Sequence, residues 1–315
     1  MQPVQFLKNS IALADSPPLR RTESTIWVCV AVFNRLHYTR KCLELLLEQS
    51  YSELKTIVVD DGSSDGTSEM IRDEHPEVVL LRGDGSLYWT GAMRLGIEYI
   101  LTHCATNDYV LLLNDDLVFA PDLIEKLLEN VRRHPRSLIQ AVESCLVDPD
   151  LIWQGGTDIN WWTAKHRFLN YHRRISEFPP GYCQRSAYLT GRGVLVAVEV
   201  FRSVGNFDPR YQQNGDPEFT RRAAKAGYEL LVAYDVRVLS YTKGDNLNEA
   251  EWYRLSDLRP YYFSALSATR LSTRWRDAVL MTHSRVQALI FAAFSFARIT
   301  GHFFKRLRIG RQNSW

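Results

Sequence analysis

Two pairs of adjacent aspartates each follow an apolar run that has the length of a buried strand. The pair Asp60-Asp61 follows residues 54–59, and the pair Asp115-Asp116 follows residues 109–113. Adjacent carboxylates offer the hard oxygen ligands that Mg²⁺ and Mn²⁺ take together with phosphate oxygens of a substrate. Loop solvation and helix capping are the alternative interpretation of such pairs. The pattern favours a divalent metal that bridges carboxylates to a phosphorylated substrate.

The elements that would position these carboxylates alternate in type along the first half of the chain. Valine-rich apolar runs predict strands buried on both faces, and segments with helical spacing lie between them, one capped by Asn34 and another opened by Pro121. We expect strands at 26–33, 54–59, 78–81 and 109–113, and helices at 67–74 and 91–101. This alternation predicts an α/β fold with a doubly wound, mostly parallel sheet. Its carboxyl edge would bring both acidic pairs to one crevice.

The second half of the chain is less regular. A strand-like run at 189–200 is interrupted at 191–193, a short helix is expected over 218–225, and residues 230–234 and 236–241 are expected to form a strand pair. Beyond about residue 248 the chain becomes helical, aromatic and basic. We therefore predict three parts: an N-terminal arm over 1–24, a main domain over 25–248 and a helical C-terminal segment over 249–315.

Composition excludes several classes of protein. With 45% apolar and 23% charged residues, the chain has the balance of a globular protein. Lys and Arg exceed Asp and Glu by only 38 to 36, so no overall positive field would recruit nucleic acid. Five cysteines without a CxxC pair indicate reduced thiols in the cytoplasm. We find no signal peptide, and the longest apolar run, 286–299, is shorter than the roughly 18 residues of a membrane span.

Other catalytic motifs match incompletely. No GK dipeptide is present for a P-loop, and the dinucleotide fingerprint that begins at Gly83 has Tyr88 at its third glycine position. Residues 62–66 fit GxSxG, in which Ser64 would be the nucleophile of an α/β-hydrolase. Only one good strand precedes this motif, no HGGG-type segment lies upstream, and the acidic pair before it would repel an oxyanion. A serine hydrolase is therefore the weaker hypothesis.

Several segments together resemble the inverting glycosyltransferases of family 2, which have the GT-A fold. The resemblance covers residues 25–245 and includes rhamnosyltransferase-like bacterial members. It rests on motifs that occur in order: VAVFNR (30–35), VVDDGSSDGT (58–67), GDGSLYWTGAMRLGIEYI (83–100), LLNDDLVFAPD (112–122), TGRGVLVAVEVFRSVGNFDPRY (190–211) and GDPEFTRRAAKAGY (215–228). It implies inverting transfer of a sugar from a nucleoside-diphosphate donor to a glycan or lipid-linked acceptor, in the synthesis of cell-surface polysaccharide.

The resemblance implies contacts to the nucleotide donor. Asp61, with its neighbour Asp60, matches the acidic position that contacts the base. Ala31 and Phe33 are expected to line the base pocket at the end of the first strand. Asp84 lies in the segment typical of one bacterial branch of the family, and we count it with the donor-binding candidates.

The resemblance also implies the reacting groups. Asp115 matches the position that faces the ribose and shares the metal, and Asp116 matches the ligand of Mg²⁺ or Mn²⁺. Arg192 is either a surface arginine or a guanidinium held close to the diphosphate or the sugar. Asp216 matches the catalytic base and is expected in a loop just before a helix, with a helix cap as its alternative role. Glu218 is the competing assignment for the base.

The chain departs from the family pattern at one place. Many GT-A enzymes have a metal-binding histidine after the late strands, where this chain has residues 238–243 without a histidine. A third protein ligand is therefore in doubt, and Lys243 is a candidate to replace part of the metal's charge. The aromatic side chains Trp89 and Trp153 are read either as core or as platforms for a sugar ring. A non-catalytic nucleotide- or glycan-binding protein with this fold stays open as an alternative.

The C-terminal tail combines aromatic side chains with positive charge. From residue 278 to residue 315 there are six Lys or Arg and no Asp or Glu. One hypothesis is an interfacial helix that attaches the protein to the anionic cytoplasmic face of the inner membrane. The other is a helical flap that packs on the domain or on a second copy of the chain. The sequence leaves both open.

Overall fold

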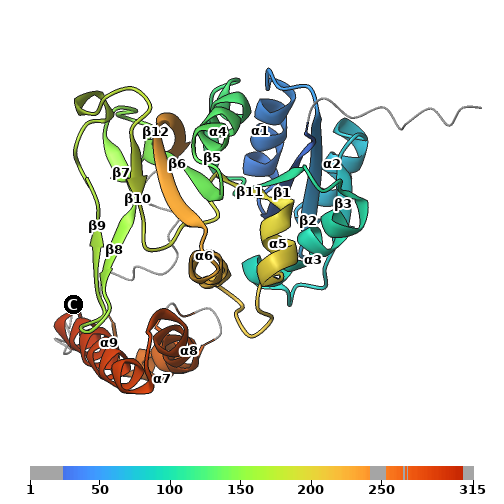
Figure 1. Ribbon diagram of the computed structural model, residues 1–315. Helices are drawn as coiled ribbons and strands as arrows, with labels where there is room; N and C mark the ends of the chain where they lie inside the picture. Colours follow the sequence, from blue (N-terminus) through green and yellow to red (C-terminus); the bar gives the residue numbers. More distant parts are fainter. Residues whose placement is uncertain (1–23, 242–252, 265–266, 268, 308–315) are drawn as a thin grey trace, which may run out of the picture.

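The computed structural model describes residues 24–241, 253–264, 267 and 269–307. Its central sheet runs in the order β3-β2-β1-β4-β11-β6-β12-β10. The first four of these strands are parallel, and the apolar runs that predicted them form β1 (Ile26–Val32), β2 (Leu54–Asp60), β3 (Val79–Arg82) and β4 (Tyr109–Leu113). Both acidic pairs follow strands that flank β1, so the structure confirms that they lie at the same carboxyl edge (Figure 1).

The rest of the sheet is mixed. The two longest strands, β6 (Ser137–Cys145) and β12 (Glu229–Ser240), pair in parallel, and β11 (Val194–Ala197) is antiparallel between β4 and β6. Short antiparallel strands extend the sheet: β5 (Leu117–Phe119), β7 (Ile152–Gln154) and β10 (Cys183–Arg185). The central sheet is therefore mostly parallel, as expected, with one reversed strand at its middle.

Helices cover both faces of the sheet. One face carries α1 (Leu36–Leu47), α2 (Thr67–Glu74) and α4 (Leu123–Arg133), and the other carries α3 (Tyr88–His103), α5 (Val198–Val204) and α6 (Gly215–Lys225). Alternate residues of β1 enter the two cores, with Val28 towards α1 and Cys29 towards α3. This alternation explains why the strand is apolar throughout.

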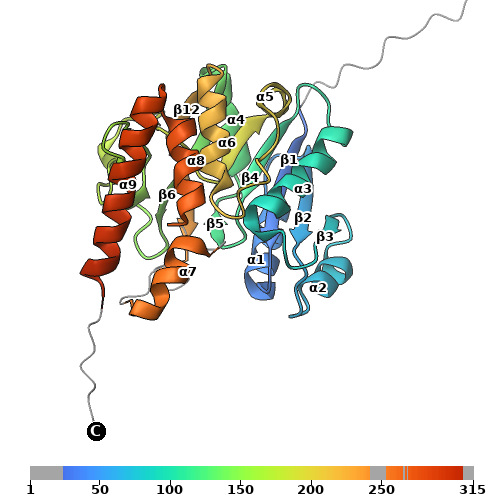
Figure 2. The same cartoon turned by 90° about the horizontal axis from the view of Figure 1, so that it is seen from below.

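The C-terminal segment packs on the domain. It contains α7 (Leu258–Phe263), α8 (Leu271–Met281) and α9 (Arg285–Lys305), and it lies beside α6 and the hairpin of β8 (Thr157–Asn160) and β9 (Lys165–Phe168) (Figures 1 and 2). The Tyr211 hydroxyl donates to Asp277 on α8 at 3.0 Å, and Arg298 on α9 donates to the carbonyl of Thr163 at 2.8 Å. Two short 3₁₀ helices, Ile175–Glu177 and Leu255–Asp257, complete the structure.

Three expectations about the second half were wrong. Residues 229–240 form one strand, because the irregularity near Asp235 is a bulge against β6 and not a turn. Residues 198–204 form a helix, because Val198, Val200 and Phe201 all enter the α3-side core. The helix expected at 218–225 begins at Gly215. In addition, Asn34 does not cap α1, which begins after Arg35 without a side-chain cap.

One expectation about membrane spans also changes. Among the described helices, α9 alone is long and apolar enough to cross a membrane, and one third (33%) of its most apolar stretch is buried inside the structure. A core helix of a soluble protein meets the same criterion, so length and composition do not decide what this helix does.

Candidate functional site

The turn after β4 carries a buried carboxylate, Asp115. Its side chain is 1% exposed, and it accepts hydrogen bonds from Arg35 Nη1 at 2.9 Å and from Thr39 Oγ1 at 3.1 Å. Burial raises the pKa of Asp115 to about 6, although the Arg35 guanidinium opposes that rise. Both oxygens are therefore used by residues at the start of α1.

Asp116, the next residue, is arranged differently. Its Oδ2 lies 3.3 Å from Arg35 Nη1, and its Oδ1 lies 3.7 Å from Arg192 Nη2. Oδ1 is buried and has no hydrogen-bond partner. An orphaned carboxylate oxygen beside a second carboxylate fits the ligand chemistry of a hard divalent cation. Among the described residues, however, no group of three or more potential ligands could hold a metal.

Arg192 connects Asp116 to a third carboxylate. Its Nε lies 3.2 Å from Oε2 of Glu143 on β6, and its Nη2 donates to Ser240 Oγ at 2.7 Å. Ser240 in turn donates to Glu143. The structure thus joins Arg192 to Asp116 and anchors it from β6 and β12. Sequence reasoning missed Glu143; a carboxylate inside an apolar run, SLIQAVESC (137–145), was the available signal.

Asp216 lies beside this cluster. It occupies the first turn of α6, not a loop before the helix as expected, and its Oδ2 accepts from the Gly191 N–H at 2.8 Å. Burial raises the pKa of Asp216 to about 6, while the positive charge of Arg192 acts in the opposite direction. A carboxylate with such a pKa is matched to proton transfer near neutral pH.

Trp89 at the start of α3 holds these parts together. Its Nε1 donates to Asn114 Oδ1 at 2.9 Å, directly before the acidic pair. Its ring lies so close to Gly191 that a Cβ there would stand 2.3 Å from Cζ2. At the next position, Thr90 lies equally close to Gly215, at 2.4 Å from an added Cβ. The two glycines therefore allow α3 to approach the loop and the helix that carry Arg192 and Asp216.

This close approach gives a first prediction. Gly191→Ala should lower the free energy of unfolding by about 1–3 kcal/mol, because the new methyl group overpacks against Trp89. Urea denaturation checks it. The matched control is Gly301→Ala on α9, where an added Cβ meets nothing within 4 Å. It should stabilise the helix by about 0.5–1 kcal/mol. Equal effects of the two substitutions would contradict the packing described here.

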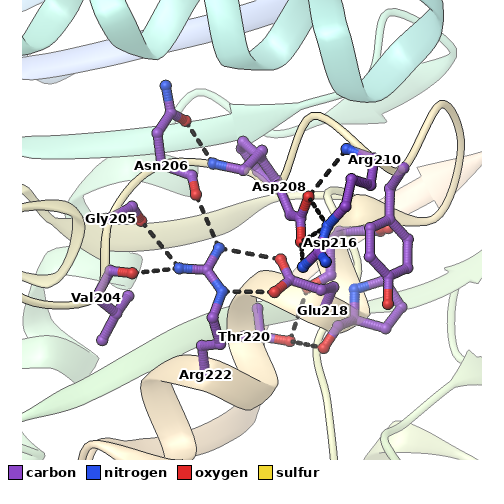
Figure 3. A network of polar contacts seen from close by, with 12 residues as sticks. Val204, Gly205, Asn206, Asp208, Arg210, Asp216, Glu218, Thr220 and Arg222 are labelled. Atoms are coloured by element: carbon purple, nitrogen blue, oxygen red, sulfur yellow. Dashed lines mark hydrogen bonds and ion pairs between the residues drawn. The ribbon is translucent and has the colours of Figure 1, made fainter. Parts of the chain in front are cut away.

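Glu218, the competing assignment for the base, is held in an ion pair. Its Oε2 lies 3.0 Å from Arg222 Nη2 (Figure 3). Arg222 also donates to the carbonyl oxygens of Val204, Gly205 and Asn206, and so fastens the loop after α5 to α6 (Figure 3). The Glu218 side chain is only 4% exposed. These contacts give Glu218 a structural role.

The aspartates after β2 shape two turns. Asp60 is fully buried, and its carboxylate accepts from the Ser63 N–H and the Ser68 hydroxyl, so its expected contact with a nucleotide is replaced by a structural role. Asp61 accepts from the backbone N–H groups of Gly85, Leu87 and Tyr88, which fixes the start of α3. Tyr88 and Trp89 thereby link the first acidic pair to the second.

The remaining donor candidates lie close to the same edge. Asp84 is exposed, and its Oδ1 accepts from the N–H and hydroxyl of Ser86, which lowers its pKa. Ala31 is partly buried near the end of β1, and Phe33 just beyond it has a side chain that is 51% exposed. An exposed aromatic ring at a strand end is available for stacking on a planar base. Lys243 lies outside the described residues.

Ser64 does not have the surroundings of a nucleophile. Its N–H donates to Asn34 Oδ1 at 2.8 Å, and its hydroxyl lies 3.4 Å from the same atom. Within the described part of the chain, no histidine forms a hydrogen bond with Ser64, whereas a serine nucleophile needs an adjacent base. The hydrolase hypothesis is not favoured.

Comparison with known proteins decides the family. The family described as "Glycosyl transferase family 2" matches residues 27–190, more than half of the chain. The chain belongs to this family. It is 26% identical to N-acetylglucosaminyl-diphospho-decaprenol L-rhamnosyltransferase of Mycobacterium tuberculosis, over 60% of this chain and 66% of that protein. It is 24% identical to the succinoglycan biosynthesis protein ExoA of Rhizobium meliloti, over 64% of this chain and 59% of that protein.

Solved structures confirm the GT-A fold. S. aureus TarS 1-349 in complex with UDP covers 90% of this chain and 76% of its own, with a TM-score of 0.56 and 14% identity. The structure of GalNAc-T7 with UDP, GalNAc and Mn²⁺ matches 90% of this chain and 58% of its own chain, with a TM-score of 0.58 and 14% identity. The sequence-based identification of a family 2 glycosyltransferase with helices after a mixed α/β domain is therefore confirmed.

Proposed function

We propose that this family 2 chain transfers a sugar from a nucleoside-diphosphate donor to a hydroxyl group of a glycan or lipid-linked acceptor, with inversion at the anomeric carbon. The observation that carries the proposal is the cluster at the carboxyl edge of the sheet. It combines Asp115 and Asp116 with Arg192, and it places Asp216 beside Arg192 through Gly191. Cations and carboxylates for a diphosphate leaving group thus lie next to a partly buried base.

Asp216 is the proposed base. Its carboxylate is oriented by one backbone N–H group and carries a pKa of about 6, so it is deprotonated at neutral pH and can accept the acceptor's proton. Glu218 has the same chemistry, but both of its oxygens face Arg222. We therefore assign the proton transfer to Asp216 and the fastening of the α5–α6 loop to Glu218.

Arg192 and the acidic pair are the proposed diphosphate site. A guanidinium anchored by Glu143 and Ser240 can donate to phosphate oxygens without losing its position. Asp116, with Asp115 beside it, would hold Mg²⁺ or Mn²⁺, since its Oδ1 has no hydrogen-bond partner. When bound, such an ion would neutralise negative charge on the leaving diphosphate. The nucleotide is proposed to lie beside Ala31, Phe33, Asp61 and Asp84. Asp61 contributes by fixing the turn at 83–88.

The relatives support the substrate classes. One is named for a sugar attached to diphospho-decaprenol, and another, from Haloferax volcanii, is a glucosyl-dolichyl phosphate glucuronosyltransferase. Solved structures of the same fold hold UDP, UDP-GlcNAc or GDP-Man, two of them with Mn²⁺. We propose a nucleotide sugar as donor and a cytoplasmic location at the inner membrane, in the synthesis of cell-surface polysaccharide.

A ligand screen tests this function. The full chain is melted with UDP, GDP and dTDP sugars, each with and without Mn²⁺, because a ligand that binds only the folded state raises the melting temperature. The donor found in this way is then incubated with candidate acceptors, and free and transferred sugar are measured. Metal-dependent binding without turnover on any acceptor would instead favour a non-catalytic binding protein with this fold.

The exposed face of α9 supports a membrane contact. Phe291, Ile299 and Phe303 are buried on one side of the helix. Side chains on the other side are apolar and about half exposed or more: Val286, Leu289, Phe294, Phe296 and Phe304. Exposed cations flank them at Arg285, Arg298 and Lys305. We propose that the segment both packs on the domain and presents this face to an anionic lipid surface.

Vesicle binding tests the membrane contact. Replacing Leu289 and Phe296 with serine should reduce sedimentation with anionic vesicles about tenfold, because less apolar area enters the lipid. Salt should weaken binding of the unchanged chain. Leu47→Ser on α1, where the side chain is 63% exposed, is the control and should bind normally. Equal binding to anionic and neutral vesicles would contradict the proposed contact with an anionic membrane. A concentration-dependent dimer that the double substitution abolishes would indicate that this face binds a second copy of the chain instead.

A further inference from the structure

Arg35 occupies the position between the two carboxylates. It is the last residue before α1, and its Nη1 lies 2.9 Å from Asp115 Oδ1 and 3.3 Å from Asp116 Oδ2. Its guanidinium also lies over the ring of Tyr38, 5.5 Å from the centroid. A single positive group thus bridges one oxygen of each carboxylate and lies beside the proposed metal ligand Asp116.

Without this bridge, the cluster would have two more carboxylates than guanidinium groups. Asp115, Asp116 and Glu143 supply three carboxylates, and Arg35 and Arg192 supply two guanidinium groups. Two carboxylates on adjacent residues repel each other, and a positive charge between them removes most of that cost. Burial of Asp115 increases the need for a partner, because a buried charge without one is strongly destabilising.

The two arginines differ in how firmly they are held. Arg192 is tied to Glu143 and Ser240 in addition to Asp116, and its side chain is 23% exposed. Arg35 has a side chain that is 32% exposed, and within the described part of the chain its two ion pairs both go to the aspartates. Arg35 can therefore leave the carboxylates for solvent without breaking another ion pair, whereas Arg192 cannot.

We propose that Arg35 is an exchangeable counter-ion, which neutralises Asp115 and Asp116 until a divalent cation takes its place. The inference rests on the proposed function in one respect, the metal at Asp116. Guanidinium and cation would compete to neutralise the same pair of carboxylates, so Arg35 lowers the affinity of the donor-free protein for the metal. By the reciprocity of linked equilibria, the metal would in turn release the Arg35 side chain.

Calorimetry with Mn²⁺ alone, in the absence of any nucleotide, tests the competition. Arg35→Met keeps a long side chain over Tyr38 but removes the charge. We expect it to bind Mn²⁺ about tenfold more tightly than the unchanged full chain. Arg40→Met on α1, which removes an exposed pair with Glu74, is the matched control and should leave Mn²⁺ affinity unchanged. Arg35→Lys retains a positive charge and should leave the affinity close to that of the unchanged chain.

Melting temperatures give a second readout that does not depend on activity. In EDTA, Arg35→Met should melt below the unchanged chain, because Asp115 and Asp116 then lack a counter-ion. Mn²⁺ should raise the melting temperature of Arg35→Met more than that of the unchanged chain. Equal Mn²⁺ affinity of the two proteins would overturn the role of Arg35 and leave the metal site standing. No Mn²⁺ binding by either would overturn the metal assignment itself.

Discussion

Asp216→Asn is expected to lower kcat by roughly 10²–10⁴-fold, the usual contribution of a general base. Asparagine keeps the shape of the side chain, and its oxygen can still accept from the Gly191 N–H, but it cannot take the acceptor's proton. Donor affinity should stay within about twofold, because a base that acts only on the acceptor contributes little to ground-state donor binding. Single-turnover transfer and donor calorimetry on the same preparation separate the two quantities.

Glu218→Gln is the matched control for this substitution. It removes a carboxylate two residues away, on the same helix, and it breaks the charge pair with Arg222. Because Glu218 is buried and Arg222 is partly exposed, we expect a loss of about 1.5–3 kcal/mol in the free energy of unfolding. The transfer rate of the molecules that remain folded should be close to normal. If Glu218→Gln abolishes transfer while Asp216→Asn retains most of it, the base is Glu218.

The pH dependence follows from the same carboxylate. The base acts in its deprotonated form, and burial raises its pKa to about 6, so kcat/KM should fall as the pH decreases through about 6. Asp216→Asn should remove this acidic limb. Acid unfolding through this group cannot explain the fall in kcat/KM, because a carboxyl whose pKa is raised by folding binds its proton more tightly in the folded state. Its contribution to stability therefore increases as the pH falls from about 6 towards 4.

The parts of the site that could be predicted from the sequence are those attached to a strand or helix end in a recognisable motif. Asp115 and Asp116 follow a buried strand, so spacing alone placed them at the sheet edge. Asp216 was assigned only through the resemblance to the family, and it lies in the first turn of α6 and not in a loop before it. Asp60 shows the limit of that reasoning. Its position in the motif is right, yet its carboxylate is consumed by the turn that follows β2.

The parts that could not be predicted depend on contacts between distant segments. Glu143 on β6 joins the cluster only because β6 lies next to β12, where Ser240 donates to it. These two residues are 97 positions apart in the sequence. Trp89 becomes the centre of the site because Gly191, more than 100 residues later, leaves room for its ring. Local propensity also misassigned residues 198–200 to a strand, where core packing overrides the preference of valine for strands.

Asp116→Asn is expected to weaken Mn²⁺-dependent donor binding at least about 100-fold, since even the residues behind a metal ligand commonly contribute 10- to 100-fold. The physical reason lies in the two neighbours. Asp115 has both oxygens engaged by Arg35 and Thr39, so it cannot replace Asp116 without giving up a buried contact. Asp116 alone offers an oxygen without a hydrogen-bond partner. Asparagine retains one oxygen but removes the negative charge that attracts the cation.

Asp122→Asn provides the control for that substitution. Asp122 precedes α4, six residues after Asp116, and pairs with Lys126 at the surface. Its replacement removes one negative charge from the same part of the chain but should leave Mn²⁺-dependent donor binding within about twofold, because exposed pairs contribute little. Calorimetry of donor binding with Mn²⁺ and with EDTA measures both variants. Tight, metal-dependent binding by Asp116→Asn would move the metal to other ligands and leave Asp116 as the counter-ion of Arg35 and Arg192.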